Sequence, residues 1–273
     1  MSNIRRFFGG KGSTAAYAVV SAILAFVPEE FFKHGFISCE WSDTAIITVN
    51  RVILFLFIFA VANMIYFLYR NNRRFVILSE KTTTIKIEYG NICRIKDGKK
   101  VINFDECFTT TVGTRPGEIK EDSVCGQYLK DYPIDDIQSF LDNAGVKPIG
   151  KSKYNNQDSY EPGLLVPRDD FFLMAFAKLD ENGLGRHTYE SYLVCLDKLW
   201  EQIDLYHGTE DVYLPILGSR ITRFEKELTQ QELLDIMIAS YRLNPNKLKK
   251  PNTLHIVCKN REDFSLNNVF GVE

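Results

Sequence analysis

Residues 212–224 read VYLPILGSRITRF and carry the strongest indication of the fold class of this chain. The first six residues form an apolar run that is typical of a buried strand. Gly218 and Ser219 follow at once as a turn, and Thr222 and two arginines come next, ahead of a helical pattern. A strand that leads through a glycine turn toward a helix is typical of an α/β sheet.

The segments on either side alternate between helix and strand. Thr188–Tyr206 has the spacing of an amphipathic helix, and Thr229 with Glu232 predicts a capped helix that continues to about residue 243. Further strands are predicted at Phe75–Leu78, Thr82–Glu88, Lys100–Phe104, Asp170–Lys178 and Leu254–Cys258, and a helix after Pro133. This alternation predicts an α/β domain with a largely parallel sheet over residues 75–273.

The charge of the chain is divided unequally along its length. The 273 residues sum to a net charge of −2, whereas residues 1–74 alone carry eight basic and four acidic side chains. The remainder is therefore acidic, which argues against general nucleic-acid binding. The six cysteines form no CxxC pair and the four histidines are dispersed, so the pattern indicates neither structural zinc nor a disulfide scaffold.

The most apolar part of the chain is Val52–Tyr69, VILFLFIFAVANMIYFLY. As a helix it would be about 27 Å long, close to the thickness of a bilayer core of about 30 Å. The alternative is a buried core helix, but such helices are rarely apolar on every face. Asn63 lies inside this run, and we expect it to form an interhelical hydrogen bond rather than to line a pore.

An earlier apolar run, Ala15–Val27, has only thirteen residues. This length fits a short span, an interfacial helix or the core of a signal peptide. The chain continues through Pro28 without a small-residue cleavage site, and we predict a two-helix transmembrane hairpin over residues 1–74, with spans at about 13–32 and 50–70.

Basic residues lie before the first predicted span and after the second, at Arg5, Arg6, Lys11, Arg70, Arg73 and Arg74. The loop between the spans is acidic. The positive-inside rule then predicts a multi-pass protein of the bacterial inner membrane with both termini in the cytoplasm.

Two segments of the soluble domain are candidates for ligand contact. In the first, Gly218 permits close backbone approach, and the Ser219 and Thr222 hydroxyls with the arginine side chains can donate to phosphate oxygens. A plain strand-to-helix connection with solvated arginines is the alternative. The second candidate is the end of the strand at Lys100–Phe104, where the predicted contacts are Asn103, Asp105, Glu106 and Phe108. A turn capped by Asn and Asp is its alternative.

Five segments together resemble a known family. They read VINFDECFTT, PGLLVPRDDFFLMAFAKLDENG, LWEQI, VYLPILGSRITRF and TQQELLDIMIAS. In this order they resemble the macro domains of the ThsA family of Thoeris antiphage effectors, over about residues 75–270. Two preceding spans look like the type II form of that family.

The resemblance implies a macro-domain-like three-layer α/β/α fold with a mixed sheet, and binding of an ADP-ribose derivative. In the type II form the signal is a histidine conjugate of ADP-ribose, made from NAD by a TIR-domain partner and diffusing to the effector. Binding is expected to assemble a homo-oligomer that disrupts the lipid bilayer and causes abortive infection. No cofactor, metal or nucleic acid is implied.

The family's diphosphate loop falls on Gly218, Ser219, Arg220, Ile221, Thr222 and Arg223 of this sequence. Arg220 stands where many macro domains have glycine, so its side chain either pairs with the diphosphate or narrows the pocket. The Asn-Ala-Ala-Asn run of hydrolytic macro domains is missing after Asn103. We therefore predict a sensor that is not an enzyme, with a membrane-tethered ADP-ribosyl hydrolase as the alternative and a scaffold with a vestigial pocket as a third possibility.

Overall fold

The computed structural model describes residues 18, 20–22, 26–33, 42–219, 222–259 and 264–269. The chain divides into two compact units, one ending at Arg73 and the other comprising Arg74–Val272.

The first unit is built around α4 (Asp43–Asn71), a helix of 29 residues, with the short α3 (Glu29–Lys33) packed on it. Within the described ranges, α4 is the one helix that is long and apolar enough to cross a membrane, over Asp43–Leu68. Nine of the twenty residues of the first predicted span, 13–32, lie outside the described residues, and its last four belong to the short α3, so the hairpin stays a prediction. The Asn63 amide donates to the Phe59 carbonyl of its own helix at 2.7 Å.

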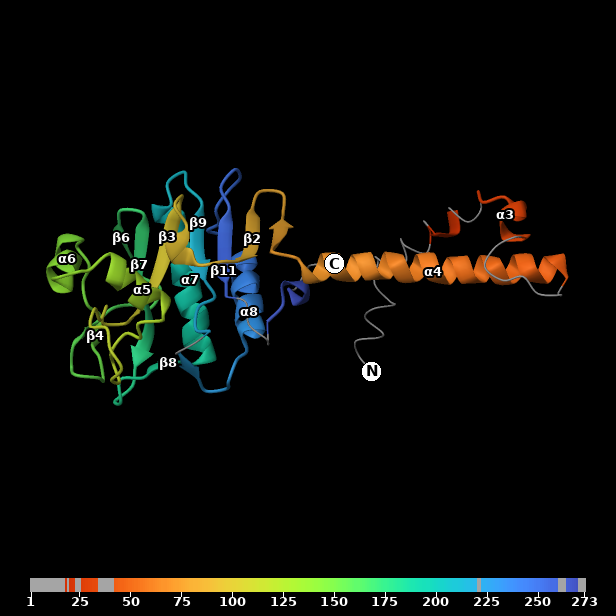
Figure 1. The fold of residues 1–273 in the computed structure, drawn as a ribbon. Helices are drawn as coiled ribbons and strands as arrows, with labels where there is room; N and C mark the ends of the chain where they lie inside the picture. Colours follow the sequence, from red (N-terminus) through yellow and green to blue (C-terminus); the bar gives the residue numbers. More distant parts are fainter. Residues whose placement is uncertain are drawn as a thin grey trace. The chain divides into compact units, whose positions relative to one another are not determined.

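The second unit contains a nine-stranded mixed sheet in the order β1-β2-β11-β9-β3-β7-β8-β10, with β6 paired to β7 (Figure 1). Strands β2, β11, β9, β3 and β7 run parallel, whereas β1 is antiparallel to β2 and β6 and β8 are antiparallel to β7. Strand β10 pairs with β8 in parallel. The bounds are β1 Phe75–Ser79, β2 Thr84–Tyr89, β3 Lys99–Asp105, β6 Leu165–Arg168, β7 Phe171–Leu179, β8 Gly185–His187, β9 Val212–Pro215, β10 Arg223–Phe224 and β11 Leu254–Cys258. A separate hairpin pairs β4 (Gly150–Lys151) with β5 (Asp158–Ser159).

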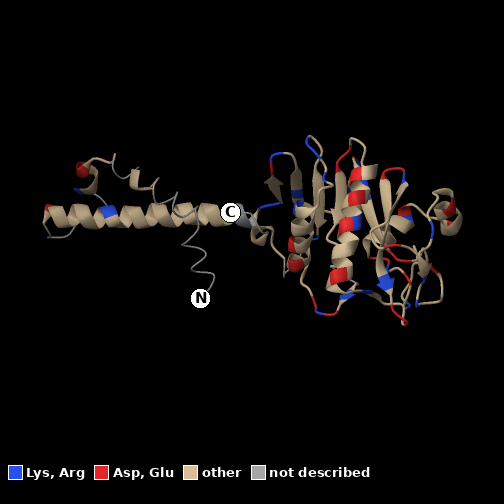
Figure 2. Cartoon of the chain, turned by 180° about the vertical axis from the view of Figure 1, so that it is seen from behind, with Lys and Arg blue, Asp and Glu red and all other residues tan. Residues whose placement is uncertain are grey.

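Helices cover both faces of this sheet. Their bounds are α5 Val124–Asp131, α6 Ile137–Asn143, α7 Tyr189–Tyr206 and α8 Gln230–Leu243, with short 3-10 turns at Ile92–Arg94 and Leu266–Asn268. Side chains of β7 alternate between two cores: Phe172 and Met174 pack with α7 and α8, while Leu173 and Ala175 pack with α5 and α6. Figure 2 shows the chain from the side opposite to Figure 1, with the positions of acidic and basic residues coloured along its helices and strands. The predicted three-layer α/β/α fold with a mixed sheet is thus confirmed.

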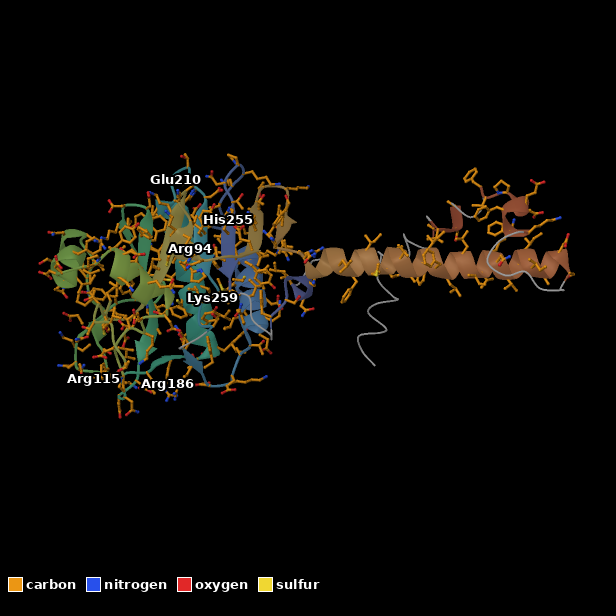
Figure 3. The ribbon with its side chains drawn as sticks, viewed as in Figure 1. Arg94, Arg115, Arg186, Glu210, His255 and Lys259 are labelled. Atoms are coloured by element: carbon orange, nitrogen blue, oxygen red, sulfur yellow. The ribbon has the colours of Figure 1, made fainter. Side chains whose placement is uncertain are left out.

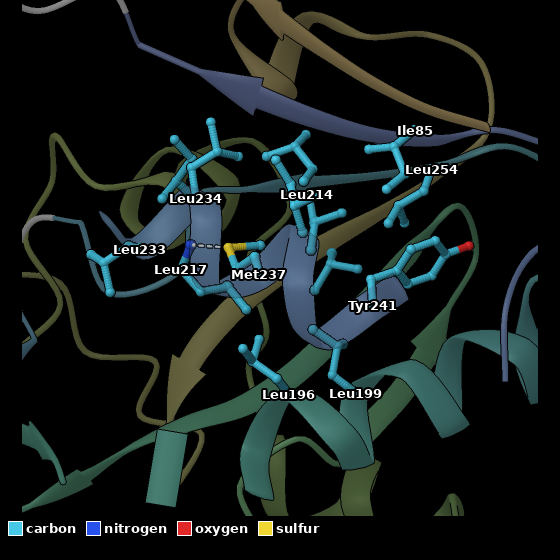
Figure 4. Close-up of a cluster of buried hydrophobic side chains, with 14 of the residues drawn as sticks. Ile85, Leu196, Leu199, Leu214, Leu217, Leu233, Leu234, Met237, Tyr241 and Leu254 are labelled. Carbon is cyan, nitrogen blue, oxygen red and sulfur yellow. Dashed lines mark hydrogen bonds between the residues drawn. The ribbon is translucent and has the colours of Figure 1, made fainter. Parts of the chain in front are cut away.

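Contacts between the end of β9 and α8 fix the position of the Gly218 turn. The backbone N–H of Leu217 donates to the Met237 sulfur at 3.4 Å, inside a cluster of buried aliphatic side chains (Figure 4). Trp200 of α7 donates its ring N–H to the Ser240 hydroxyl at 3.0 Å and so ties the two helices together. Leu217 is fully buried, and Gly218 is the first half-buried residue after it.

The central strands β3 and β9 are joined at one end only. They pair at Lys99–Lys100 with Val212–Tyr213, whereas β3 pairs with β7 as far as Asp105 and β9 pairs with β11 as far as Pro215. Toward their carboxyl ends β3 and β9 therefore separate. Ligands of α/β proteins bind beyond the carboxyl ends of strands, so this separation marks where a site is expected.

Candidate functional site

A cleft of about 860 Å³, including space open to solvent, lies at the separated carboxyl ends of β3 and β9. Figure 3 places Arg115 and Arg186 at this end of the domain and Glu210 at the opposite end. The lining residues come from six segments: Asn103–Asp105, Gly117–Lys120, Ser123–Cys125, the end of β7 with Phe176, Ala177 and Leu179, the turn with Gly183 and Gly185, and Pro215, Ile216, Gly218, Ser219 and Thr222.

The chain after β9 forms one wall of this cleft. In the sheet, β10 lies beyond β3, β7 and β8, so the connection from β9 to β10 crosses the carboxyl ends of β3 and β7 and the amino end of β8. Gly218 has φ +80°, and a Cβ on it would lie 2.9 Å from the Phe224 ring. A glycine is therefore required for both the backbone conformation and the close approach.

Only some of the predicted phosphate-loop residues line the cleft in the structure. Gly218, Ser219 and Thr222 line the cleft. Arg223 belongs to β10 and is exposed, outside the lining set. Arg220 and Ile221 lie outside the described residues.

At the end of β3, Asn103 and Asp105 line the cleft. The Asp105 carboxylate accepts hydrogen bonds from the backbone N–H of Cys107 at 2.9 Å and of Thr109 at 3.1 Å. Burial raises the pKa of the Asp105 carboxyl, and the hydrogen bonds from Thr109 and Cys107 oppose that shift. Asp105 thus holds the turn after β3 while facing the ligand space.

Glu106 and Phe108 were expected beside Asp105, but the structure does not bring them to the cleft. Glu106 accepts from the Ser152 hydroxyl at 2.6 Å and from the Leu179 N–H at 3.0 Å, and Phe108 packs among buried aromatic rings. Strand β3 ends at Asp105, and Glu106 lies in the turn that follows, where its bonds to Ser152 and Leu179 hold its side chain outside the lining of the cleft.

Sequence reasoning missed the start of α5 as part of the site. Ser123 caps this helix, since its hydroxyl accepts from the Gly126 N–H at 2.9 Å, and Val124 and Cys125 line the cleft. The first N–H groups of a helix favour anions. Burial raises the pKa of the Cys125 thiol well above its usual value, so the thiol stays neutral. The Ser123 cap was the available sequence signal.

A smaller cavity of about 470 Å³ adjoins the cleft and shares Val124, Pro215, Ile216 and Ser219 with it. Its other walls are Gly90–Ile92 after β2, Val257–Lys259 at the end of β11, and Gln230 of α8. Gln230 is 4% exposed, and its side-chain N–H group donates to the Lys259 carbonyl at 3.3 Å. Its buried side-chain oxygen has no hydrogen-bond partner among the residues that the structure describes.

These features fit a phosphate-bearing ligand with a hydrogen-bonding ring system. The start of α5 and the Gly218 turn supply donors for an anion, and the cavity beside them supplies an unused buried acceptor for an amino or hydroxyl group. Across the described ranges, no group of three or more His, Cys, Asp or Glu side chains is arranged to hold a metal ion.

Comparison with known proteins then gives the family. A family model described as "Thoeris protein ThsA, Macro domain" matches residues 85–259, which begin in β2, end just after β11 and include both cavities. The chain belongs to the ThsA macro-domain family. Membership in the ThsA family makes it a Thoeris antiphage defence protein that carries a macro domain.

The individual relatives share low sequence identity with this chain. A Thoeris protein ThsA of Bacillus amyloliquefaciens is 27% identical over 222 residues, covering 76% of this chain and 72% of that protein. A mutant macrodomain of Oceanobacillus iheyensis matches with a TM-score of 0.47 and 11% identity, covering 70% of this chain and 93% of that chain.

Proposed function

We propose that this ThsA-family chain is a nucleotide-gated antiphage effector. Its macro domain binds an ADP-ribose-derived signal, the histidine conjugate made by a TIR-domain partner, and binding drives assembly that disrupts the inner membrane. The observation that carries this proposal is the continuity of the cleft with its side cavity across the ends of five strands.

Each part of such a ligand has a matching surface. The diphosphate fits between the start of α5 and the Gly218 turn, where backbone N–H groups and the Ser219 and Thr222 hydroxyls are within the lining. The base fits the side cavity, where the oxygen of Gln230, which has no partner among the described residues, can accept from an exocyclic amino group. Asn103 and Asp105 then lie on the ribose side.

Two features of the cleft favour binding over turnover. The Cys125 thiol is neutral and is therefore not an activated nucleophile, and one oxygen of the Asp105 carboxylate is engaged by the backbone N–H groups of Cys107 and Thr109. A hydrolase remains the second candidate, because the bond between ribose and the conjugated group would lie near Asn103.

Coupling to the membrane follows from the covalent order of the chain. Only Asn72, Arg73 and Arg74 separate the end of α4 from β1, so a change in the assembly of macro domains reaches α4 through three residues. A single chain with one or two spans encloses no pore, and we therefore expect the lipid-disrupting form to be a homo-oligomer. The signal has to bind that form better than the resting one, since equal affinity shifts no equilibrium.

The test uses a fragment of residues 74–273, which contains both hydrophobic cores and forms its own compact unit. Calorimetric titration with ADP-ribose and with its histidine conjugate measures affinity, and chromatography of the mixture measures turnover. We expect tight binding of the conjugate without turnover. Absence of binding would refute the nucleotide-gated function, and release of free ADP-ribose would establish the hydrolase instead. Leakage of dye from liposomes holding the full chain, with and without conjugate, then tests membrane disruption.

A further inference from the structure

Two of the glycines that line the cleft meet at one end of it. The Gly117 N–H donates to the Gly183 carbonyl at 3.0 Å, and both residues have positive φ, +77° and +75°. The Tyr154 ring occupies the space beside both Cα atoms: a Cβ on Gly183 would lie 2.9 Å from this ring, and a Cβ on Gly117 would collide with it. The Tyr154 hydroxyl donates to the Pro116 carbonyl at 2.9 Å.

The backbone of Tyr154 is itself held by hydrogen bonds. It lies between β4 and β5, where its backbone N–H donates to the Ser152 hydroxyl at 3.3 Å. The Ser152 hydroxyl donates in turn to Glu106 at 2.6 Å, and Glu106 also binds the N–H of Leu179 at the end of β7. Ser152 and Glu106 are 5% and 6% exposed, so these bonds are shielded from water. A continuous chain of contacts therefore runs from the strand ends to Pro116.

The segment that Tyr154 holds, residues 113–120, has its own internal bonds. Glu118 accepts from the Arg115 N–H at 2.7 Å, and the Lys120 ammonium donates to the Thr114 carbonyl at 2.6 Å. The segment is thus a preformed loop. Its tip is joined to the neighbouring turn and hairpin through the Gly117–Gly183 bond and the Tyr154 side chain, and Gly117–Lys120 of the same loop line the cleft.

We propose that Tyr154 is a positioning residue that latches loop 113–120 closed along the cleft and thereby sets ligand affinity. It does not line the cleft itself; it acts through Pro116 and Gly117. The effect on affinity rests on the proposed function, whereas the latch does not. Glu106 acts as the buried anchor of the latch instead of contacting the ligand.

The test measures amide hydrogen exchange of peptides from residues 113–120 in the ligand-free full chain, held in detergent micelles. Tyr154→Phe keeps the ring and removes one hydrogen bond, so exchange should accelerate about fivefold, the equivalent of about 1 kcal/mol. Tyr154→Ala also removes the ring and should accelerate exchange by more than tenfold. Tyr189→Phe is the matched control, because this tyrosine is 55% exposed on α7, and it should leave exchange unchanged.

Affinity for ADP-ribose and for its histidine conjugate, measured on the same variants, should fall in the same order, with global unfolding little changed. Unaltered exchange in Tyr154→Ala would overturn the latch. Faster exchange with undiminished affinity would overturn its positioning role. If the unmodified chain binds neither nucleotide, the proposed function fails, and the exchange rates still decide whether Tyr154 holds the loop.

Discussion

Replacing Gly218 with alanine tests the wall of the cleft that the sequence indicated most clearly. An L-residue in the left-handed region costs about 1–2 kcal/mol, and Gly218 has φ +80°. The added methyl group would also lie 2.9 Å from the Phe224 ring. That ring has little room to move, since it packs edge-on against Tyr192 at 5.2 Å and alongside His187 at 6.2 Å. Overpacking of this kind costs about 1–3 kcal/mol more.

Gly208→Ala is the matched control. Gly208 has φ +62°, and nothing lies within 4 Å of where its Cβ would be, so it carries the backbone cost alone. Urea denaturation of the 74–273 fragment should show Gly218→Ala losing about 2–5 kcal/mol and Gly208→Ala about 1–2 kcal/mol. Calorimetry should show weaker nucleotide binding for Gly218→Ala only.

A double-mutant cycle with Phe224→Leu isolates the contact with the ring. The smaller side chain leaves space for the new methyl group, so the two substitutions should couple favourably by about 1 kcal/mol. Equal losses of stability in the two glycine variants, or strict additivity in the cycle, would refute the reasoning that the Phe224 ring fixes the Gly218 turn.

Three further predictions follow from buried polar groups. Burial lowers the pKa of His187 from 6.5 to about 4, so protonation of the unfolded chain should destabilise the domain as the pH falls from about 6.5 toward 4, by roughly 3 kcal/mol in all. In urea titrations at pH 7 and pH 5, His187→Gln should reduce the loss of unfolding free energy between the two pH values. An unchanged loss would contradict this prediction. Gln230→Leu should weaken nucleotide binding about tenfold in calorimetry, because it removes the buried acceptor of the side cavity, and unaltered affinity would place the base elsewhere. Trp200→Phe should lower the free energy of unfolding by about 1–3 kcal/mol, because it removes the hydrogen bond to Ser240 and some packed volume. Nucleotide affinity should stay unchanged. A loss of affinity would show that the α7–α8 contact affects ligand binding in the cleft.

The sequence was sufficient to predict the helices that have long, regular patterns of apolar residues. Thr188–Tyr206 and the helix capped by Thr229 and Glu232 both appear in the structure with their capping boxes. Helix α5 was not predicted, because Gly126 in its first turn has the appearance of a helix breaker. In the structure that glycine is needed, since a Cβ there would collide with the Lys120 carbonyl. This reason is tertiary and leaves no trace in a local pattern.

The same limit applies to the candidate site. The polar residues at the end of β3 predicted Asp105 and Glu106 together as ligand contacts. Which of the two side chains lines the cleft depends on where β3 ends and on an irregularity in the pairing of β3 with β7 after Phe104. The segments that complete the cleft, Gly117–Lys120 and the turn at Gly183, lie outside both motifs in the sequence. Only the order of the strands brings them together.

The short pairing of β3 with β9 has a thermodynamic consequence. The two halves of the sheet are paired at Lys99–Lys100 with Val212–Tyr213, and β3 and β9 have no backbone pairing farther along, so backbone hydrogen bonds between these strands do not oppose a spreading motion about this point. A ligand that touches Asn103 on one side and Ile216 on the other restrains that motion. Binding should therefore be driven by enthalpy and opposed by a loss of conformational entropy. The cost of restraining the sheet lowers the net free energy of binding.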